Sequence, residues 1–315
     1  MSSEIVIKFL VAAVLAGTPF LFGTVGEILS EKVGHLNLGV EGMMSIGACA
    51  GFMVGYQTDN FVAALLAAAV AGMLSALIYG VLTVTFMANQ NVTGLTLTIF
   101  GVGLANFIGV FMLETLKLPD AVTAQMRNIH IPGLSDLPVV GELLFSYNPF
   151  VYLGIIIAIV ASFYLYKTQV GLNVQAIGEN PGAADAAGIE VTKWRYINIL
   201  LSGAICGIGG AYCSMIINGG VWLRDSVGGL GWISVALVIF AAWKPINVIY
   251  GSFIFGALRV LKYYVPKNTY AIPTAFFDAL PFIITALVLV IASMRKNKGA
   301  HIPAHLGENY FREER

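Results

Sequence analysis

Charged residues are scarce in this chain of 315 residues. Only 11% of its residues are Asp, Glu, Lys or Arg and 58% are hydrophobic, whereas an ordinary soluble domain carries about 25% charged residues. No charged residue occurs between Asn60 and Leu113, and about 20 apolar residues are enough to cross a hydrocarbon core. The composition therefore excludes a soluble globular domain and predicts a membrane protein. Acidic and basic residues balance at 17 each, so nothing points to nucleic acid as a partner.

Motifs for nucleotide hydrolysis, metal binding and nucleophilic catalysis are also missing. No G-x-x-x-x-G-K-[ST] sequence is present to hold ATP phosphates, and no H-E-x-x-H sequence is present to hold zinc. The three cysteines have no metal-ligand spacing. A gradient-driven carrier typically keeps ionisable residues in mid-span, and here only Arg259 and Asp278 come near such a position. We expect no catalytic residue, no metal and no cofactor in this chain, with energy supplied by a partner or an ion gradient.

Hydropathy and turn signals define nine apolar segments. A single-chain membrane protein is either helical or a closed barrel, and segments this long without two-residue alternation exclude the barrel. We predict an all-α integral membrane protein with about nine transmembrane helices in one domain, residues 1–315. The segments are 5–25, 38–56, 61–87, 92–113, 148–167, 195–217, 229–243, 246–262 and 274–293.

The two halves of the chain show a similar order of elements. In each half a span is followed by a glycine-rich approach to a second helix, at residues 34–42 and 228–231, and then by two more spans. An odd number of spans separates the copies, which predicts an inverted repeat. The glycines at positions 203, 207, 209 and 210 favour close packing of one helix against its neighbours.

Basic residues near the span ends predict the orientation in the membrane. Three of them follow Ser293, and others flank residues 168–194, so both regions are expected to be cytoplasmic. Nine spans then place the N-terminus outside and the C-terminus, in a cytoplasmic tail of residues 294–315, inside. The longest external connection, residues 114–147, is long enough to form a docking surface, although a plain solvated loop is the alternative.

The cytoplasmic loop contains the sequence TQVGLNVQAIGENPGAADAAGIE, residues 168–190. Asn180 is a good N-cap, Pro181 suits the first helical position, and Gly188 suits a left-handed stop, so we predict a helix of about two turns. Such a short helix is marginal in water by itself. It either packs on the bundle's own surface or docks into a separate protein through its small alanine face.

Four sequence blocks resemble a known family. GENPGAADAAGI (178–189) is similar to the coupling-loop signature of ABC-importer permeases in the branched-chain amino acid, ribose and nucleoside group. GEILSEKVGHLNLGVEGMM (26–44) resembles the signature of the nucleoside and simple-sugar branch. GWISVALVIFAAWKP (231–245) and ALPFIITALVLV (279–290) are similar to two further blocks of that branch. The resemblance covers nearly the whole chain, with departures at Gln175, Gly182, Lys244 and Thr98.

This resemblance implies a type II-like importer bundle that works with other subunits. They are a cytoplasmic ABC ATPase that binds ATP and Mg, a second homologous permease and an extracytoplasmic substrate-binding lipoprotein, in the cytoplasmic (inner) membrane of a prokaryote. The residues that the resemblance assigns to ATPase coupling are Gly178, Glu179, Asn180, Pro181, Ala183, Ala184, Ala187 and Gly188.

The segment around residues 26–48 gathers charge beside the first span. Glu27 and Glu31 are one helical turn apart and repel each other unless Lys32 or another chain compensates them. Asn37 and Gly39 open the next helix and place Glu41 in its first turn, where free N–H groups stabilise a carboxylate. We predict that this segment forms an inner gate that senses the state of the ATPase. A capped helix start is the simpler alternative.

Polar and aromatic residues within the spans are candidates for the lining of the solute pathway. Amide and hydroxyl groups suit a neutral, hydrogen-bonding solute, and an aromatic face can stack on a base. Anchoring at the membrane interface explains the tryptophans equally well. The candidates are Asn89, Gln90, Thr93, Thr96, Asn106, Trp222 and Trp232.

Three classes of function remain to be weighed. The resemblance favours the permease subunit of a binding-protein-dependent ABC importer, for nucleosides ahead of simple sugars. A stand-alone secondary carrier or channel is the second interpretation, and reconstitution of this chain alone separates it from the first. A membrane enzyme is the third, and the missing catalytic motifs argue against it.

Overall fold

The computed structural model describes residues 3–113, 116–130, 132–133, 135, 137, 139–265, 274–294 and 302–311. Within these ranges the chain is helical without a β-strand, and Lys117 and Val221 form one isolated bridge. Three helices continue into a π-helical turn. The elements are α1 Ser3–Lys32, α2 Val40–Thr58, α3 Phe61–Gly80, η1 Val81–Thr85, α4 Gln90–Ile108, η2 Gly109–Leu113, α5 Asp120–Gln125, α6 Val140–Leu144, α7 Pro149–Lys167, α8 Gln169–Glu179, α9 Pro181–Ala186, α10 Val191–Tyr212, η3 Cys213–Ile217, α11 Leu230–Phe240, α12 Pro245–Tyr264 and α13 Thr274–Met294.

Each of the nine apolar segments lies on a helix, which confirms the all-α class. Five of these helical stretches are long and apolar enough to cross a membrane by length and composition: Glu4–Lys32, Phe61–Thr85, Gln90–Met112, Pro149–Lys167 and Val191–Ile217. α2 and α12 are of similar length, and α11 has 11 residues. The count of nine crossings therefore stays a prediction.

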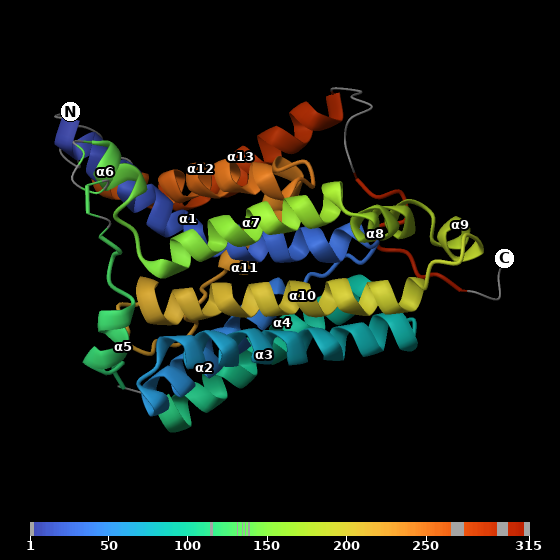
Figure 1. Cartoon of the computed structure of the whole chain (residues 1–315), viewed down its shortest axis with the longest axis horizontal. Helices are drawn as coiled ribbons and strands as arrows, with labels where there is room; N and C mark the ends of the chain where they lie inside the picture. The colour runs from blue at the N-terminus through green and yellow to red at the C-terminus, as the bar shows by residue number, and fades with distance from the viewer. Residues whose placement is uncertain are drawn as a thin grey trace.

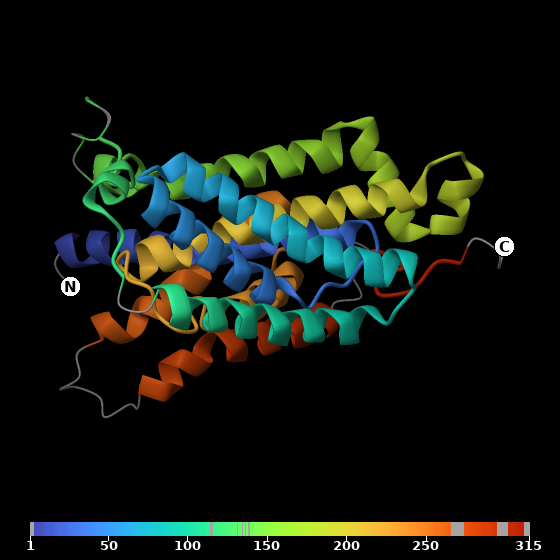
Figure 2. The same cartoon turned by 90° about the horizontal axis from the view of Figure 1, so that it is seen from below.

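α1 and α10 lie side by side in the interior of the bundle and run in opposite directions (Figures 1 and 2). α1 also packs on α12, α11 and α7, whereas α10 packs on α3 and α2. Glycines permit these contacts, because a Cβ at Gly207 or Gly210 would overlap the backbone of α3 or α2. α1 and α10 each begin one copy of the predicted repeat, and an inverted repeat requires their opposite directions.

The two ends of the bundle are built differently. The N-terminus, α5 and α6 lie at one end, and α8, α9 and the C-terminus lie at the other (Figure 1). The predicted external loop, residues 114–147, contains the two short helices α5 and α6. Its residues 114–115, 131, 134, 136 and 138 lie outside the described part. The predicted cytoplasmic loop 168–194 is mostly helical, because α8 occupies its first half and α10 begins at Val191 instead of residue 195.

Two irregular segments connect long helices to shorter ones. The first connecting segment, residues 33–39, joins α1 to α2 and lies at the end that carries α8 and α9. The second connecting segment, residues 218–229, joins η3 to α11, and its Trp222 and Gly220 bond to residues 116 and 118 near the other end. Each segment leads to a helix, and the first turns of these two helices meet inside the bundle through Glu41.

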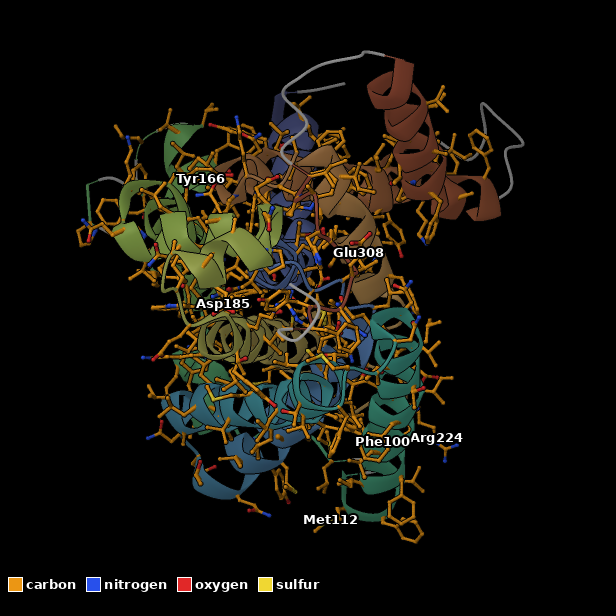
Figure 3. The ribbon with its side chains drawn as sticks, turned by 90° about the vertical axis from the view of Figure 1, so that its right-hand side faces the viewer. Phe100, Met112, Tyr166, Asp185, Arg224 and Glu308 are labelled. Atoms are coloured by element: carbon orange, nitrogen blue, oxygen red, sulfur yellow. The ribbon has the colours of Figure 1, made fainter. Side chains whose placement is uncertain are left out.

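The surface formed by α3 and α4 is apolar. Large hydrophobic side chains are exposed along α3 with η1 and along α4 with η2, and Figure 3 labels Phe100 of α4 and Met112 of η2. Such a continuous apolar surface suits lipid or a second membrane subunit. The exposed side chains are Val62, Leu66, Val70, Leu74, Leu77, Ile78, Leu82, Val92, Leu95, Ile99, Phe100, Phe107, Phe111 and Met112.

Candidate functional site

α9 has the caps that the sequence predicts. The Asn180 side chain accepts a hydrogen bond from the Ala183 N–H at 2.9 Å, and Pro181 occupies the first turn. Gly188 adopts φ +84°, in the left-handed region that ends a helix. The result is a helix of six residues that projects beyond the ends of the long helices (Figure 1).

The alanines of α9 point in different directions. Ala184 is only 4% exposed and packs in a core cluster with Val174, Ile177 and Val191. Ala184 therefore packs against residues of α8 and α10 and does not face solvent, whereas its part in ATPase coupling stays a prediction. Ala183, Ala187 and Gly188 are exposed. The surface open to a partner is this second face, which we call the α9 outer face.

α8 was not foreseen as a helix, and it joins α9 to the end of α1. Thr168 caps α8, and Gly178 in its last turn comes so close to Lys32 that a Cβ there would overlap the Lys32 carbonyl oxygen. Glu179 is exposed and its carboxylate accepts a hydrogen bond from the Ala304 N–H at 3.3 Å. The last turn of α8 therefore lies directly against the last residue of α1.

Glu27 and Glu31 lie deeper than expected. The helix that was predicted to end near residue 25 continues to Lys32, and Glu27 and Glu31 are 0% and 3% exposed. The Glu27 carboxylate accepts a hydrogen bond from the Asn37 N–H at 2.9 Å. The Glu31 carboxylate accepts one from the indole Nε1–H of Trp243, which follows α11. Lys32 also interacts electrostatically with Glu31, as the sequence suggests. Compensation for these carboxylates therefore comes from groups of this chain.

The first connecting segment is enclosed by protein. Non-helical backbone is tolerated in a membrane bundle only where protein or water satisfies its polar groups. Here the Leu36 N–H donates to the Gln90 side chain at 2.9 Å, and the Leu36 carbonyl accepts from the Tyr79 hydroxyl at 2.8 Å. The Leu38 carbonyl accepts from Thr98 at 2.8 Å. α3 and α4 therefore hold this segment in place.

His35 and Arg195 are buried close together without full pairing. Arg195 was expected as the first residue of a span, but α10 begins four residues earlier at Val191, and the Arg195 side chain is 2% exposed. Both ring nitrogens of His35, and Nε and Nη2 of Arg195, have no hydrogen-bond partner among the described residues. Burial lowers the pKa of His35 well below its usual value, and the nearby Arg195 and His305 lower that pKa further. His35 is therefore neutral at physiological pH.

Glu41 lies in the first turn of α2, as predicted, but its carboxylate serves a different helix. Its Oε1 accepts a hydrogen bond from the Gly229 N–H at 2.8 Å, and its Oε2 accepts one from the Gly231 N–H at 2.6 Å. Gly229 is the N-cap residue of α11 and Gly231 lies in its first turn, where the helix dipole favours negative charge. Glu41 is 6% exposed and joins the starts of α2 and α11.

Asn37 and Gly39 prepare the start of α2. The Asn37 side chain accepts a hydrogen bond from the Gly39 N–H at 2.8 Å, and a Cβ at Gly39 would lie 2.8 Å from a Leu97 methyl group. Both residues are buried. They are therefore part of the packed entry to α2, as the sequence predicts, and are enclosed by α4.

The predicted pathway residues do not converge on one cavity. Asn89 caps α4, and Thr93 and Thr96 bond back to their own helix. Gln90 is 2% exposed and bridges the first connecting segment to residue 308. Asn106 exchanges two hydrogen bonds with Asp225. Trp222 is 5% exposed against Phe52, whereas Trp232 is 37% exposed on α11.

A cavity of about 300 Å³ lies between α1, α11, α12 and α13. Arg259 contributes an Nη1 group that is buried without a hydrogen-bond partner among the described residues. In the sequence, Arg259 stood out only as one of two ionisable residues near the middle of a predicted span. The other lining residues are Phe20, Gly228, Gly229, Leu230, Ile233, Lys262, Phe277, Pro281 and Phe282. Among the residues the structure describes, no group of three His, Cys, Asp or Glu side chains could hold a metal ion.

Comparison with known proteins shows similarity to membrane transport permeases. Residues 9–289 match the family described as branched-chain amino acid transport system / permease component. The putative glucose ABC transporter permease protein TsgC13 of Haloferax volcanii is 33% identical, covering 96% of this chain and 97% of its own length. The nucleoside ABC transporter permease protein NupC of Lactococcus lactis is 33% identical over 87% and 88%. The guanosine ABC transporter permease protein NupQ of Bacillus subtilis is 33% identical over 88% and 89%.

Proposed function

This chain belongs to the family of branched-chain amino acid transport system permease components, and on that premise we propose that it imports nucleosides as part of an ATP-driven assembly. It is the membrane-spanning permease of an ABC transporter for nucleosides or sugars. Two of the three relatives named above are permeases for nucleosides or guanosine, which favours a nucleoside. A simple sugar is the second candidate, because the relative that covers most of this chain is named for glucose.

The α9 outer face is the proposed contact with a cytoplasmic ATPase. The coupling proposal rests on one observation. α9 projects beyond the bundle, and the exposed residues Ala183, Ala187 and Gly188 of its outer face are all small. Small residues permit the close approach of a second protein. The chain has no P-loop of its own, so the energy of ATP reaches it through such a contact.

The assembly and its orientation follow from the same proposal. α8 and α9 face the cytoplasm together with the C-terminus, and the N-terminus, α5 and α6 face the outside. A second homologous permease completes the pathway, and an extracytoplasmic binding lipoprotein delivers the solute. The charge pattern near the span ends and the gathering of α8 and α9 at one end of the bundle support this arrangement.

The geometry suggests how ATP binding moves the bundle. A pull on α9 acts through Gly178 on the end of α1, and α1 continues into the first connecting segment. That segment opens into α2, whose Glu41 holds the start of α11. The motion therefore reaches the point where the two halves of the chain meet, and we assign the inner gate to residues 33–41.

A charge on the α9 outer face tests the docking proposal. Ala183→Arg adds a long cation to an exposed position, so it should leave folding unchanged and reduce copurification of the ATPase at least tenfold. Ala124→Arg on α5, exposed at the opposite end, is the matched control and should retain the ATPase. Equal copurification of both variants would reject docking through α9. Ala184 is unsuitable for this test, because charge at a buried site destabilises the fold by itself.

Uptake by the reconstituted assembly tests the solute. Vesicles that contain the permeases, the ATPase and the binding protein should accumulate radiolabelled guanosine in an ATP-dependent manner, with unlabelled glucose failing to compete. Competition by glucose at a similar concentration would favour the sugar instead. Accumulation by this chain alone without ATP would identify a secondary carrier.

A further inference from the structure

The C-terminal strap, residues 302–311, lies across the end of the bundle that carries α8 and α9. Figure 3 looks onto this end and shows Glu308 in the middle of the face, between the half that contains α8 and the half that contains α4. Only Pro303 is buried within the strap, and its other residues are half-buried or exposed. The strap is therefore held mainly by polar contacts, which water can replace.

The strap is bonded to the first connecting segment. The Gly307 N–H donates to the Gly34 carbonyl at 3.1 Å, where both glycines have positive φ. A Cβ at Gly34 would lie 3.3 Å from the His305 carbonyl oxygen. Position 307 also faces Leu36, since a Cβ built there lies 3.9 Å from the Leu36 Cβ. The strap thus touches the segment to which we assign the inner gate.

The strap also forms hydrogen bonds to the end of α8 and to α9. The His305 N–H donates to the Gly178 carbonyl at 2.9 Å. The Tyr310 hydroxyl donates to the Asp185 carboxylate at 2.9 Å, which attaches the strap to α9 itself. Tyr310 also packs against the core cluster that includes Ala184. A shift of α9 must therefore move the strap or break this bond.

A third attachment joins the strap to the turn before α4. The Asn309 amide donates to the Met87 carbonyl at 2.6 Å, and the Gln90 amide donates to the Glu308 carbonyl at 3.2 Å. Gln90 also accepts from Leu36, so one side chain holds both the strap and the first connecting segment. Ten residues near the C-terminus therefore tie α9, α4 and the first connecting segment together.

Beneath this region lie polar groups that lack partners. His35 and Arg195 are fully buried, with four nitrogen atoms unpaired among the described residues. His305 is a neighbour of His35, and Tyr310 is a neighbour of Arg195. A buried polar group without a partner favours any state in which water can reach it. Lifting the strap would admit water to both side chains, so the latched state is opposed by their desolvation.

We propose that the C-terminal strap is a latch that holds the inner gate closed and is released through Tyr310 when the ATPase moves α9. This rests on the proposed docking of α9. Release lets residues 33–39 shift and lets water reach His35 and Arg195, which stabilises the open state. The latch thus has two states, and the ATPase selects between them through the position of α9.

Cross-linking of the strap to the gate measures the two states directly. In a Leu36→Cys, Gly307→Cys double variant, the Cβ separation of 3.9 Å suits a disulfide. The variant is purified with the ATPase subunit, and disulfide formation is timed in the resting assembly and after trapping with ATP and vanadate. We expect rapid formation at rest and at least fivefold slower formation after trapping. Each single cysteine variant controls for backbone strain at position 307.

The outcomes separate the latch from the docking proposal. If the ATPase subunit fails to copurify with the wild-type chain, the proposed docking fails and the latch fails with it. If the ATPase copurifies and the cross-linking rate is the same in both states, only the latch is overturned. Once formed, the disulfide should abolish ATP-dependent guanosine uptake, and reduction with dithiothreitol should restore it.

A single hydroxyl tests the link between α9 and the strap. Tyr310→Phe removes the bond to Asp185 and should lower the number of solute molecules moved per ATP at least threefold, with ATPase copurification unchanged. Tyr166→Phe is the matched control, because its hydroxyl donates to the Trp243 carbonyl at 3.1 Å at the same end of the bundle but outside the strap. Equal coupling ratios for both variants would overturn the role of Tyr310.

Discussion

The two connecting segments occupy equivalent places in the two halves of the chain, and they are held in different ways. Residues 33–39 are all buried or half-buried and bond to α1, α3, α4 and the C-terminal strap. Residues 218–229 include the exposed Leu223, Arg224 and Asp225, and five positions with positive φ. The second segment bonds to Leu116 and Leu118 through Trp222 and Gly220, and its Asp225 and Gly229 bond to Asn106 and Glu41.

This difference suggests that the two segments have different tasks. The first segment is controlled by parts of the chain that reach the proposed ATPase contact, so a distant motor can move it. The second segment has more exposed surface and is attached to residues 116 and 118 near the opposite end of the bundle, so it can yield to a partner on that face. Glu41 is the one described side chain that bonds across the starts of α2 and α11, and it therefore decides whether the two segments act together.

Removal of the Glu41 carboxylate should produce the largest effect. Glu41→Ala removes the acceptor of the buried Gly231 N–H and of the half-buried Gly229 N–H, which should cost about 3 kcal/mol of unfolding free energy. Glu41→Gln keeps one acceptor oxygen and should cost about half of that. Unfolding in detergent measures both, with the exposed Glu142→Gln on α6 as the control. Unchanged uptake and ATPase stimulation in Glu41→Gln would show that the link between the segments has no part in gating.

Loss of the Gln90 side-chain amide should weaken the first connecting segment and the strap, and leave the second connecting segment unchanged. Gln90→Met keeps most of the packing but leaves the N–H of the half-buried Leu36 without its acceptor, so we expect a loss of about 1 kcal/mol. The strap also loses the bond to Glu308, and its cleavage by protease should become faster. Gln57→Met, at an exposed position on α2, should change stability by less than about 0.5 kcal/mol. A resistant strap in Gln90→Met would contradict the shared anchor.

The sequence predicted the parts of this structure that depend on local chemistry. The nine helical segments follow from apolar runs, and the caps of α9 follow from Asn180, Pro181 and Gly188. Glu41 in the first turn of α2 was also foreseen. Such features depend on residues within a few positions of one another, so their signals survive in a single sequence.

The missed features depend on partners that are distant in the sequence. Glu31 is buried because Trp243 supplies a donor 212 positions away, and the charge itself suggested an exposed span end. The strap bonds mainly to backbone carbonyls such as those of Gly34 and Gly178, which leave no mark in the sequence. The burial of Ala184 likewise follows from α8, whose mixed composition hid its helix.

Removal of the Asn106–Asp225 hydrogen bonds should lower the unfolding free energy by a smaller amount than loss of the Glu41 carboxylate and should affect only the second connecting segment. Asn106 donates to the Asp225 carboxylate at 2.7 Å and accepts from its N–H at 3.0 Å. Because Asp225 is exposed, Asn106→Ala should cost about 1 kcal/mol, and a double-mutant cycle with Asp225→Ala should give a coupling of about 1 kcal/mol. The cross-linking rate between positions 36 and 307 should stay unchanged. A change in that rate would mean that the two segments are coupled by a route other than Glu41.

Acid should weaken the first connecting segment through His35. The pKa of His35 is lowered in the folded protein by burial and by the neighbouring Arg195 and His305, so the unfolded chain binds the proton more readily. The contribution of neutral His35 is therefore fully present above a pH of about 6.5 and is lost as the pH falls, by about 1 kcal/mol between pH 7 and pH 5.5. His35→Phe keeps an aromatic ring beside Tyr79 and should remove this part of the pH dependence. An identical pH profile for the wild type and His35→Phe would mean that His35 already reaches water in the folded protein, and that the first segment is as accessible as the second.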